Sequence, residues 1–151
     1  MYIIYLILCA VFVAADILTK YIVTCNMSVG DTIPLISGIF HLTYVKNTGA
    51  AFSILSGQRI FLILLPALIV AALVIYTIVK KPKNKLLLLS FSLIISGGIG
   101  NLIDRIGVGY VIDFFDFRMI NFPVFNVADI WVTVGAALFV ILLLFSKEEV
   151  L

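Results

Sequence analysis

Four long apolar runs constrain the fold of this sequence more than any other feature. They cover residues 2–24, 60–79, 86–103 and 127–145. A helix needs about 20 apolar residues to cross the hydrocarbon core of a bilayer, and each run is close to that length. Only 12% of the 151 residues are charged, whereas soluble domains are about a quarter charged. We therefore predict an all-α membrane protein with four transmembrane helices, organised as a single domain over residues 1–151.

Basic side chains predict the orientation of these helices. They crowd the short connection between the second and third runs, and one follows the fourth run: Lys80, Lys81, Lys83, Lys85 and Lys147. Lysine and arginine are enriched in cytoplasmic loops, so we expect this connection and both termini on the cytoplasmic side. Residues 25–59 and 104–126 then lie outside.

The outer segments have the pattern of a small sheet. Residues 39–49, "IFHLTYVKNTG", alternate between apolar and polar and then reach a turn sequence, which is typical of a strand followed by a tight turn. Residues 110–115, "YVIDFF", form a second strand-like run. We expect a small extracytoplasmic β-containing segment that lies on the membrane, with Phe40, Tyr44 and Phe52 at the interface, where aromatic rings are enriched.

The placement of the aspartates indicates where the chemistry lies. All six fall in the predicted outer half of the molecule or outside it: Asp16, Asp31, Asp104, Asp113, Asp116 and Asp129. An ionisable group at membrane depth costs several kcal/mol unless it is paired or hydrated. A structural ion pair explains Asp16, because Lys20 follows it at i,i+4. Asp113 and Asp129 lie in apolar surroundings at one predicted depth, so we predict that this pair is functional.

The remaining polar residues allow plainer interpretations. Asn101, Asp104 and Arg105 form either an interfacial helix-end cluster or part of a site, and Asn47 with Gly49 either a simple turn or part of a site. Helix packing explains a run of small residues, which let helices approach closely: Gly97, Gly98 and Gly100. We interpret two further charges as solvated loop residues: Asp116 and Arg118.

The cysteines and the histidine argue against a disulfide and a metal centre. Cys9 and Cys25 are 16 residues apart on one predicted helix, which is about 24 Å by helical rise. That distance is far beyond disulfide reach, so both thiols are expected to be unpaired. His41 is the only histidine, and no zinc-ligand spacing is present. We predict no metal and no cofactor.

Two other classes of protein have to be weighed. Intramembrane acids also mark ion paths, so a small ion- or proton-coupled carrier is one alternative. A carrier favours polar groups through both leaflets, whereas here the inner halves of the runs lack charge apart from flanking lysines. A structural or assembly subunit is the other alternative, and it has no need of two unpaired acids in apolar surroundings.

Five ordered motifs carry a resemblance that covers nearly the whole chain. They read "DILTK" (16–20), "NTGAAF" (47–52), "GGIGNLIDR" (97–105), "VIDFFDF" (111–117) and "FNVAD" (125–129). With these motifs, the chain resembles the lipoprotein signal peptidases, the bacterial signal peptidase II family. The resemblance implies an aspartic endopeptidase in the bacterial cytoplasmic (inner) membrane, with its active site near the outer surface. It also implies substrates, namely prolipoproteins that bear a diacylglyceryl-cysteine and are cleaved just before that cysteine.

The resemblance assigns roles to individual residues. Asp113 and Asp129 match the catalytic pair of the family. The supporting and substrate-binding positions match nine residues: Asp16, Lys20, Asn47, Gly49, Asn101, Asp104, Arg105, Asn126 and Ala128. Two neighbouring carboxylates cannot both ionise easily, so they share one proton, and one serves as base while the other serves as acid. Membrane lipid is an expected partner, nucleic acid is not, and we expect a monomer.

Overall fold

The computed structural model describes residues 2–49, 55 and 57–145, so Phe52 and Lys147 lie outside the described residues. The elements in chain order are α1 (Tyr2–Asn26), β1 (Thr32–Ile36), β2 (Phe40–Asn47), α2 (Arg59–Lys80), α3 (Lys85–Gly107), β3 (Val111–Phe117), the 3-10 turn η2 (Arg118–Ile120) and α4 (Val127–Phe145). All four α-helices are long and apolar enough to cross a membrane. The predicted fold class, four transmembrane helices with a small sheet, is confirmed.

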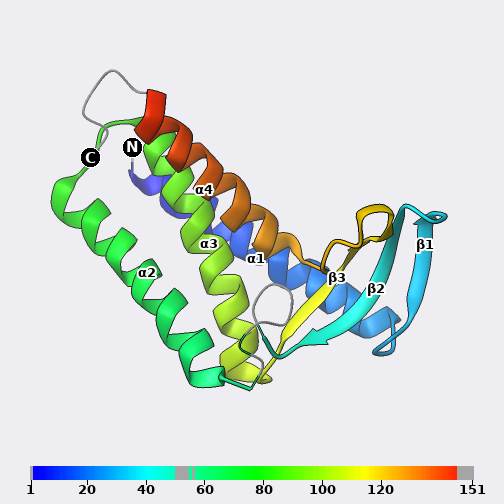
Figure 1. Ribbon diagram of the computed structural model, residues 1–151. Helices are drawn as coiled ribbons and strands as arrows, with labels where there is room; N and C mark the ends of the chain where they lie inside the picture. Colours follow the sequence, from blue (N-terminus) through cyan, green and yellow to red (C-terminus); the bar gives the residue numbers. More distant parts are fainter. Residues whose placement is uncertain (1, 50–54, 56, 146–151) are drawn as a thin grey trace.

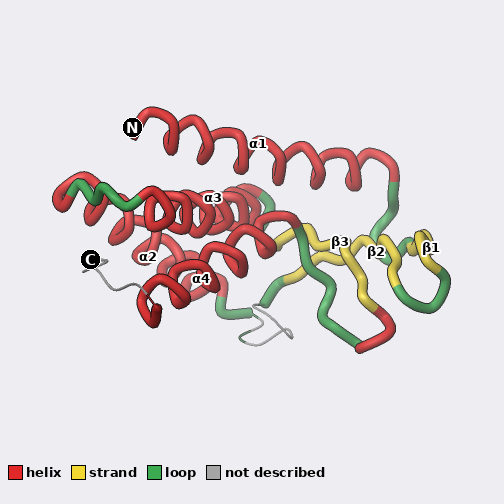
Figure 2. The backbone as a smooth tube through the Cα atoms, turned by 90° about the horizontal axis from the view of Figure 1, so that it is seen from above, coloured by secondary structure: helices red, strands yellow, loops and turns green. Residues whose placement is uncertain are grey.

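Helix α3 is the central helix of the bundle, as Figures 1 and 2 show. It packs against α1, α2 and α4. Its inner half contributes Leu87, Phe91 and Ile95 to a buried cluster, against which Tyr76 of α2 and Phe139 of α4 pack. Within the described residues, α2 makes no comparable contact with α1 or α4. Among the described residues, the position of α2 therefore depends mainly on α3.

Glycines on α3 allow the close helix packing that the sequence predicted. A Cβ on Gly97 would overlap the carbonyl oxygen of Ala128 on α4, and one on Gly98 would lie 2.7 Å from Cγ2 of Val70 on α2. A Cβ on Gly100 would overlap the carboxylate of Asp16 on α1. The prediction that these glycines serve packing is confirmed, and one of them also makes room for a charged group.

The three strands form an antiparallel sheet in the order β1-β2-β3. Figure 2 shows the sheet beyond one end of the helical bundle, beside the end of α1. Tyr44 and Phe114 pack there against Val23 of α1 and Met27, the residue that follows α1. Strands β2 and β3 occupy the predicted runs. Strand β1 was not predicted, because its side chains are exposed on both faces and therefore show no apolar alternation.

The register of β2 and β3 places one predicted acid beside the bundle. Asp113 of β3 pairs with Val45, and Asn47 at the end of β2 pairs with Val111. The pairing shifts between Leu42 and Val45, which marks a bulge in β2. After β2 the chain turns, and the backbone N–H of Gly49 donates to Oδ1 of Asn47 at 2.9 Å. The predicted turn is confirmed, and it brings the Asn47 side chain to the edge of the helical bundle.

Candidate active site

Asp113 projects from β3 into the interior, with 2% of its surface exposed. Each of its carboxylate oxygens accepts a hydrogen bond from an amide. Nδ2 of Asn47 donates to Oδ2 at 2.8 Å, and Nδ2 of Asn126 donates to Oδ1 at 2.7 Å. Burial raises the pKa of Asp113 to about 7, and the nearby charge of Asp129 adds to the shift, against the effect of the two amide donors. A buried carboxyl group therefore holds its proton near neutral pH.

Asp129 lies in the first turn of α4, where its backbone geometry is fixed by a reciprocal cap. The backbone N–H of Asn126 donates to Oδ2 of Asp129 at 3.1 Å, and the backbone N–H of Asp129 donates to Oδ1 of Asn126 at 2.9 Å. This is the pairing of a capping box, and a negative charge is favourable at a helix N-terminus. Nδ2 of Asn101 donates to the other oxygen, Oδ1, at 2.8 Å.

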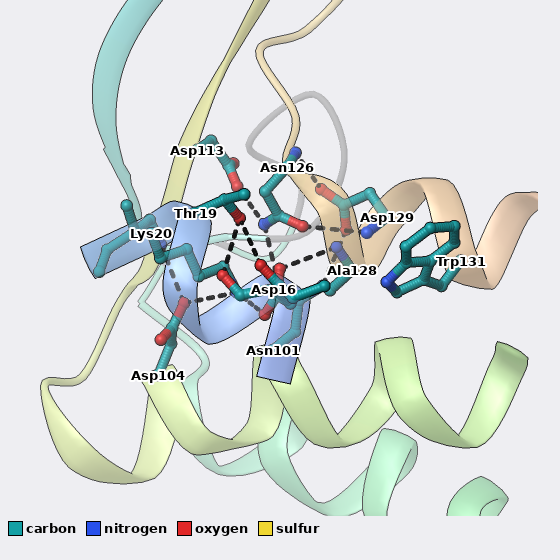
Figure 3. Close-up of polar contacts among 12 residues, drawn as sticks. Asp16, Thr19, Lys20, Asn101, Asp104, Asp113, Asn126, Ala128, Asp129 and Trp131 are labelled. Atoms are coloured by element: carbon teal, nitrogen blue, oxygen red, sulfur yellow. Dashed lines mark hydrogen bonds and ion pairs between the residues drawn. The ribbon is translucent and has the colours of Figure 1, made fainter. Parts of the chain in front are cut away.

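Asn126 connects the two acids, as Figure 3 shows. It is fully buried, and its Nδ2 donates both to Asp113 and, at 3.1 Å, to Oδ1 of Asn101. Its Oδ1 and its backbone N–H are both bonded to Asp129. The structure therefore brings the predicted pair together, from a strand and from a helix, at one residue: the Asn126 side chain binds the Asp113 carboxylate and the Asn126 backbone binds that of Asp129.

Lys20 lies on the other side of this network and is also buried, with 3% exposed. Its Nζ is 2.8 Å from Oδ2 of Asp16 and 2.8 Å from Oδ2 of Asp104, and it donates to Oδ1 of Asn101 at 3.1 Å. The predicted ion pair within α1 is present. Because the ammonium group binds the oxygen of the Asn101 amide, the nitrogen of that amide faces Asp129.

Two backbone hydrogen bonds join the acids around Lys20 to the elements that hold Asp113 and Asp129. Oδ1 of Asp16 accepts from the N–H of Ala128 at 2.9 Å, next to Asp129 on α4. Oδ2 of Asp104 accepts from the N–H of Ile112 at 3.2 Å, next to Asp113 on β3. The charged cluster on α1 and α3 therefore fixes the backbone beside both predicted acids.

Arg105 completes the arrangement in the last turn of α3. Its Nη2 donates to the carbonyl oxygen of Gly49 at 2.8 Å, just past β2. This contact holds the turn whose Asn47 side chain binds Asp113. All eleven residues singled out in the sequence thus lie in one continuous hydrogen-bonded network.

One interpretation from the sequence is wrong. Asp116 is not a solvated loop charge, since only 9% of its surface is exposed. Oγ1 of Thr43 donates to its Oδ2 at 2.6 Å and Nε of Arg118 donates at 2.9 Å, while Nη2 of Arg118 donates to Oγ1 of Thr32 at 2.7 Å. Arg118 is only two residues away, but Thr43 on β2 and Thr32 on β1 are far away in the sequence, so only the strand register reveals these two partners. Asp116 and Arg118 instead brace the sheet.

A cavity of about 1100 Å³ opens beside the two acids. Asp113, Asp129 and Arg105 line one part of it, and its remaining wall is largely apolar. The apolar wall includes Phe61, Leu65, Pro66 and Ile69 of α2 together with Val132 and Val134 of α4. The sequence could not identify these residues, because any lipid-facing helix carries the same types. The cavity joins the polar network to the membrane-spanning region.

The structure describes both cysteines and most of the side chains that could bind a metal ion. Cys9 and Cys25 are both free. In residues 2–49, 55 and 57–145, no group of three His, Cys, Asp or Glu side chains is arranged to hold a metal ion.

Comparisons with known proteins agree with this geometry. A family model for signal peptidase (SPase) II matches residues 8–145. The chain is 46% identical over 140 residues to a lipoprotein signal peptidase of Halothermothrix orenii, which covers 93% of this chain and 94% of that protein. It is 44% identical over 137 residues to one of Streptococcus thermophilus, with 91% and 88% covered.

A solved structure supports the same assignment. It is described as a bacterial membrane enzyme, and it superposes with a TM-score of 0.87 at 34% identity, covering 97% of this chain and 94% of its own. The match therefore extends over nearly the whole chain, helices and sheet included. Sequence and fold together show that the chain belongs to the signal peptidase II family.

Proposed function

We propose that this protein is an aspartic endopeptidase that removes signal peptides from prolipoproteins, and that Asp113 and Asp129 are its catalytic pair. One observation carries the proposal: the two carboxylates come from separate elements, line one cavity and accept hydrogen bonds from the same buried residue, Asn126, whose side-chain amide donates to Asp113 and whose backbone N–H donates to Asp129. The relatives named as lipoprotein signal peptidases support the substrate class.

The environments of the two acids suggest how they divide the reaction. Asp113 keeps the shared proton at neutral pH, because burial raises its pKa to about 7. Asp129 is then the base that removes a proton from a water molecule as the oxygen attacks the peptide carbonyl carbon. Asp113 donates a hydrogen bond to the carbonyl oxygen, where negative charge develops. Collapse of the tetrahedral intermediate breaks the C–N bond, and the leaving amine takes up a proton from the pair.

The amide side chains hold the pair in this arrangement. Asn47, Asn101 and Asn126 donate to the two carboxylates, and both acids also line the cavity. Such fixed donors need no reorganisation during the reaction.

The position of the cavity suggests the rest of the substrate. We infer that the apolar wall formed by α2 and α4 receives the diacylglyceryl group and the apolar signal segment, while the bond before the lipid-modified cysteine reaches the acids. The lysines around the connection between α2 and α3 favour cytoplasmic termini. The site then lies near the outer surface of the cytoplasmic membrane. We propose that residues 1–151 act as one domain and as a monomer.

The test is an Asp-to-Asn series, with cleavage of a diacylglyceryl-modified precursor measured in lipid. We expect Asp113→Asn and Asp129→Asn each to lower the rate by about 10³-fold or more, and the double variant to be hardly worse, because groups that act as a unit are not additive. Asp31→Asn is the matched control: its carboxylate accepts from the backbone N–H of Ser28 in an exposed turn, so wild-type rates are expected. Substantial cleavage by Asp113→Asn, with loss in Asp104→Asn, would identify a different first aspartate.

A further inference from the structure

Arg59, the first residue of α2, bonds the end of α3 and was not singled out in the sequence. Its Nε and Nη2 donate to the carbonyl oxygen of Arg105 at 3.1 and 2.8 Å, and Nη2 also donates to that of Ile106 at 3.2 Å. The last carbonyls of a helix have no partner within the helix and carry its negative dipole end. A planar guanidinium group suits such a pair of acceptors.

The backbone next to these carbonyls leaves room for the guanidinium group. Gly109 follows α3 with φ of +88°, a conformation that favours glycine. A Cβ at that position would lie 3.6 Å from Cζ of Arg59. The chain therefore turns toward β3 directly beside the Arg59 side chain, and the carbonyls of the last α3 turn stay accessible to it.

The contact joins two helices that are otherwise held by apolar side chains. Val70 fits against Gly98, and the ring of Tyr76 lies edge-on to Phe91 with centroids 5.7 Å apart. Among the described residues, no other side-chain hydrogen bond links α2 to α3. Apolar contacts are non-directional, whereas a forked donor on two carbonyls fixes both the register and the tilt of a helix. Arg59 therefore determines where the outer end of α2 lies.

That end of α2 forms one wall of the cavity beside the acids. Phe61 and Leu65 line the cavity within two turns of Arg59. Since α2 has no comparable contact with α4 in the described chain, the width between the two apolar walls depends on how α2 is attached to α3. The Arg105 residue whose carbonyl accepts from Arg59 also lines the cavity and holds Gly49.

We propose that Arg59 is a positioning residue that clamps the outer end of α2 to the last turn of α3 and so sets the width of the substrate cavity. The proposal rests on the proposed function, because it assigns this cavity to the lipid-modified substrate. Arg59 makes no hydrogen bond to the amide side chains that bind Asp113 and Asp129, so we expect the clamp to act on substrate binding and to leave the chemical step largely unchanged.

The kinetic test compares Arg59→Gln, Arg59→Lys and a matched control, Arg118→Gln. Like Arg59, Arg118 is a partly exposed arginine. It lies outside the bundle, and its partners are Asp116 and the threonines of the sheet. For Arg59→Gln we expect KM for the diacylglyceryl-modified precursor to rise about tenfold and kcat to stay within about twofold, a change of about 1.4 kcal/mol in binding. The KM of Arg59→Lys should lie between those of the wild type and Arg59→Gln, because lysine keeps the positive charge but lacks the forked pair of donors.

Several outcomes would contradict the proposal that Arg59 acts as a clamp. These are an unchanged KM, a fall in kcat at constant KM, and an equal effect of Arg118→Gln. If Arg59→Gln does not fold, Arg59→Lys decides alone: a raised KM with retained kcat supports the clamp, and wild-type constants reject it.

A second measurement does not depend on activity. Spin labels at positions 60 and 21, whose native Ile60 and Tyr21 are 74% and 64% exposed, report the distance from the start of α2 to α1 after Cys9 and Cys25 are replaced. The distance distribution should broaden in Arg59→Gln and stay unchanged in Arg118→Gln. An unchanged distribution in Arg59→Gln rejects the clamp even in an active enzyme. If the wild type cleaves no lipid-modified precursor but the distribution broadens, the proposed function fails and the clamp stands.

Discussion

At the scale of single residues, the amide of Asn126 determines what the two acids can do. Its nitrogen is shared between Asp113 and Asn101, and its oxygen accepts from the backbone of Asp129. A flipped amide would place a donor against a donor at Asp129, so the orientation is fixed by the network. The same holds for Asn101, whose oxygen is bound by Lys20. The NH2 and C=O groups of these two amides therefore cannot exchange places, and each carboxylate keeps an N–H donor facing it.

The pKa of Asp113 predicts how stability depends on pH. The folded-state value of about 7 lies above the ordinary 3.8, so between these values the folded protein binds more protons than the unfolded chain, and stability falls as pH rises. Asp113→Asn lacks this penalty. We expect the thermal midpoint of Asp113→Asn minus that of the wild type to be larger at pH 8 than at pH 5.

The same proton links pH to catalysis. Cleavage by the wild type should fall as pH rises through about 7, because Asp113 then loses the proton that the mechanism needs. Asp31→Asn, measured in parallel, gives the effect of pH on a variant outside the network. For the stability measurement, the thermal midpoint of Asp113→Asn minus that of the wild type should grow from pH 5 to pH 8. A difference that stays constant or shrinks would contradict the assignment of the proton to Asp113.

The residues differ in how far the sequence could predict them. Asp113 and Asp129 were predicted because acids in apolar surroundings are costly, and the Asp16–Lys20 pair because helical spacing places the two side chains together. The bond between Lys20 and Asp104 could not be predicted in this way, since it joins two helices far apart in the chain. Asp116 was misread because its partners become visible only when β1, β2 and β3 are in register.

At the scale of elements, the glycine face of α3 brings α1 and α4 close enough for their polar groups to meet. The carboxylate of Asp16 occupies the space where a side chain at position 100 would begin, and from there it accepts a hydrogen bond from the start of α4.

Four apolar helices and two of the strands could be predicted from length and alternation. The close approach could be predicted only in general terms, because small residues do not specify their neighbour.

Gly100→Ala should destabilise the protein strongly. The added methyl group would displace the Asp16 carboxylate and break its hydrogen bond to the N–H of Ala128, and a buried bond to a charged group is worth about 1.5–3 kcal/mol. Gly107→Ala is the control: it lies on the same helix in open space, where alanine stabilises a helix by up to about 1 kcal/mol. Thermal midpoints of the two variants measure the difference, and equal midpoints would show that Asp16 can move freely.

Asp116→Asn should weaken the sheet without affecting the chemical step. Burial opposes ionisation of Asp116, but the Thr43 hydroxyl and Arg118 outweigh it and hold the pKa of this carboxyl below its usual value. Its stabilising effect is therefore present above about pH 4 and lost as pH falls further. We expect the variant to lose about 1–3 kcal/mol at pH 7, and the difference from the wild type to shrink as pH falls below about 4. A cleavage rate well below that of the wild type, measured below the thermal midpoint, would place Asp116 in the site.

At the scale of the whole molecule, the acids and the apolar cavity meet where the sheet joins the bundle. Figure 1 shows β3 running from the end of α3, with α4 starting nearby. The polar network closes one side of this junction, and α2 with α4 supplies an apolar wall on the other. The sequence indicated the depth of the acids through helix length. It did not indicate the cavity, because a cavity is a property of how helices pack.

The cavity predicts that the lipid on the substrate is needed for cleavage. Each buried methylene contributes about 0.8 kcal/mol, so a few methylenes of the acyl chains against the apolar wall already amount to about 10²-fold in binding. We expect kcat/KM to fall by at least that factor when the precursor lacks the diacylglyceryl group. The measurement is cleavage of matched lipidated and unlipidated precursors in the same vesicles. Equal kcat/KM values would show that the acyl chains do not bind in the cavity.

The two carboxylates on Lys20 also bear on how the protein is made. Helix α1 leaves the ribosome before α3 and α4 exist, so during early synthesis Lys20 has only the partner on its own helix, Asp16. That pair has no net charge, and it can enter the bilayer at a lower cost than a single ion. Asp104 and the N–H of Ala128 become available to the pair only later. The first helix therefore carries its own counterion through membrane insertion, and the polar network closes around it when the last helix arrives.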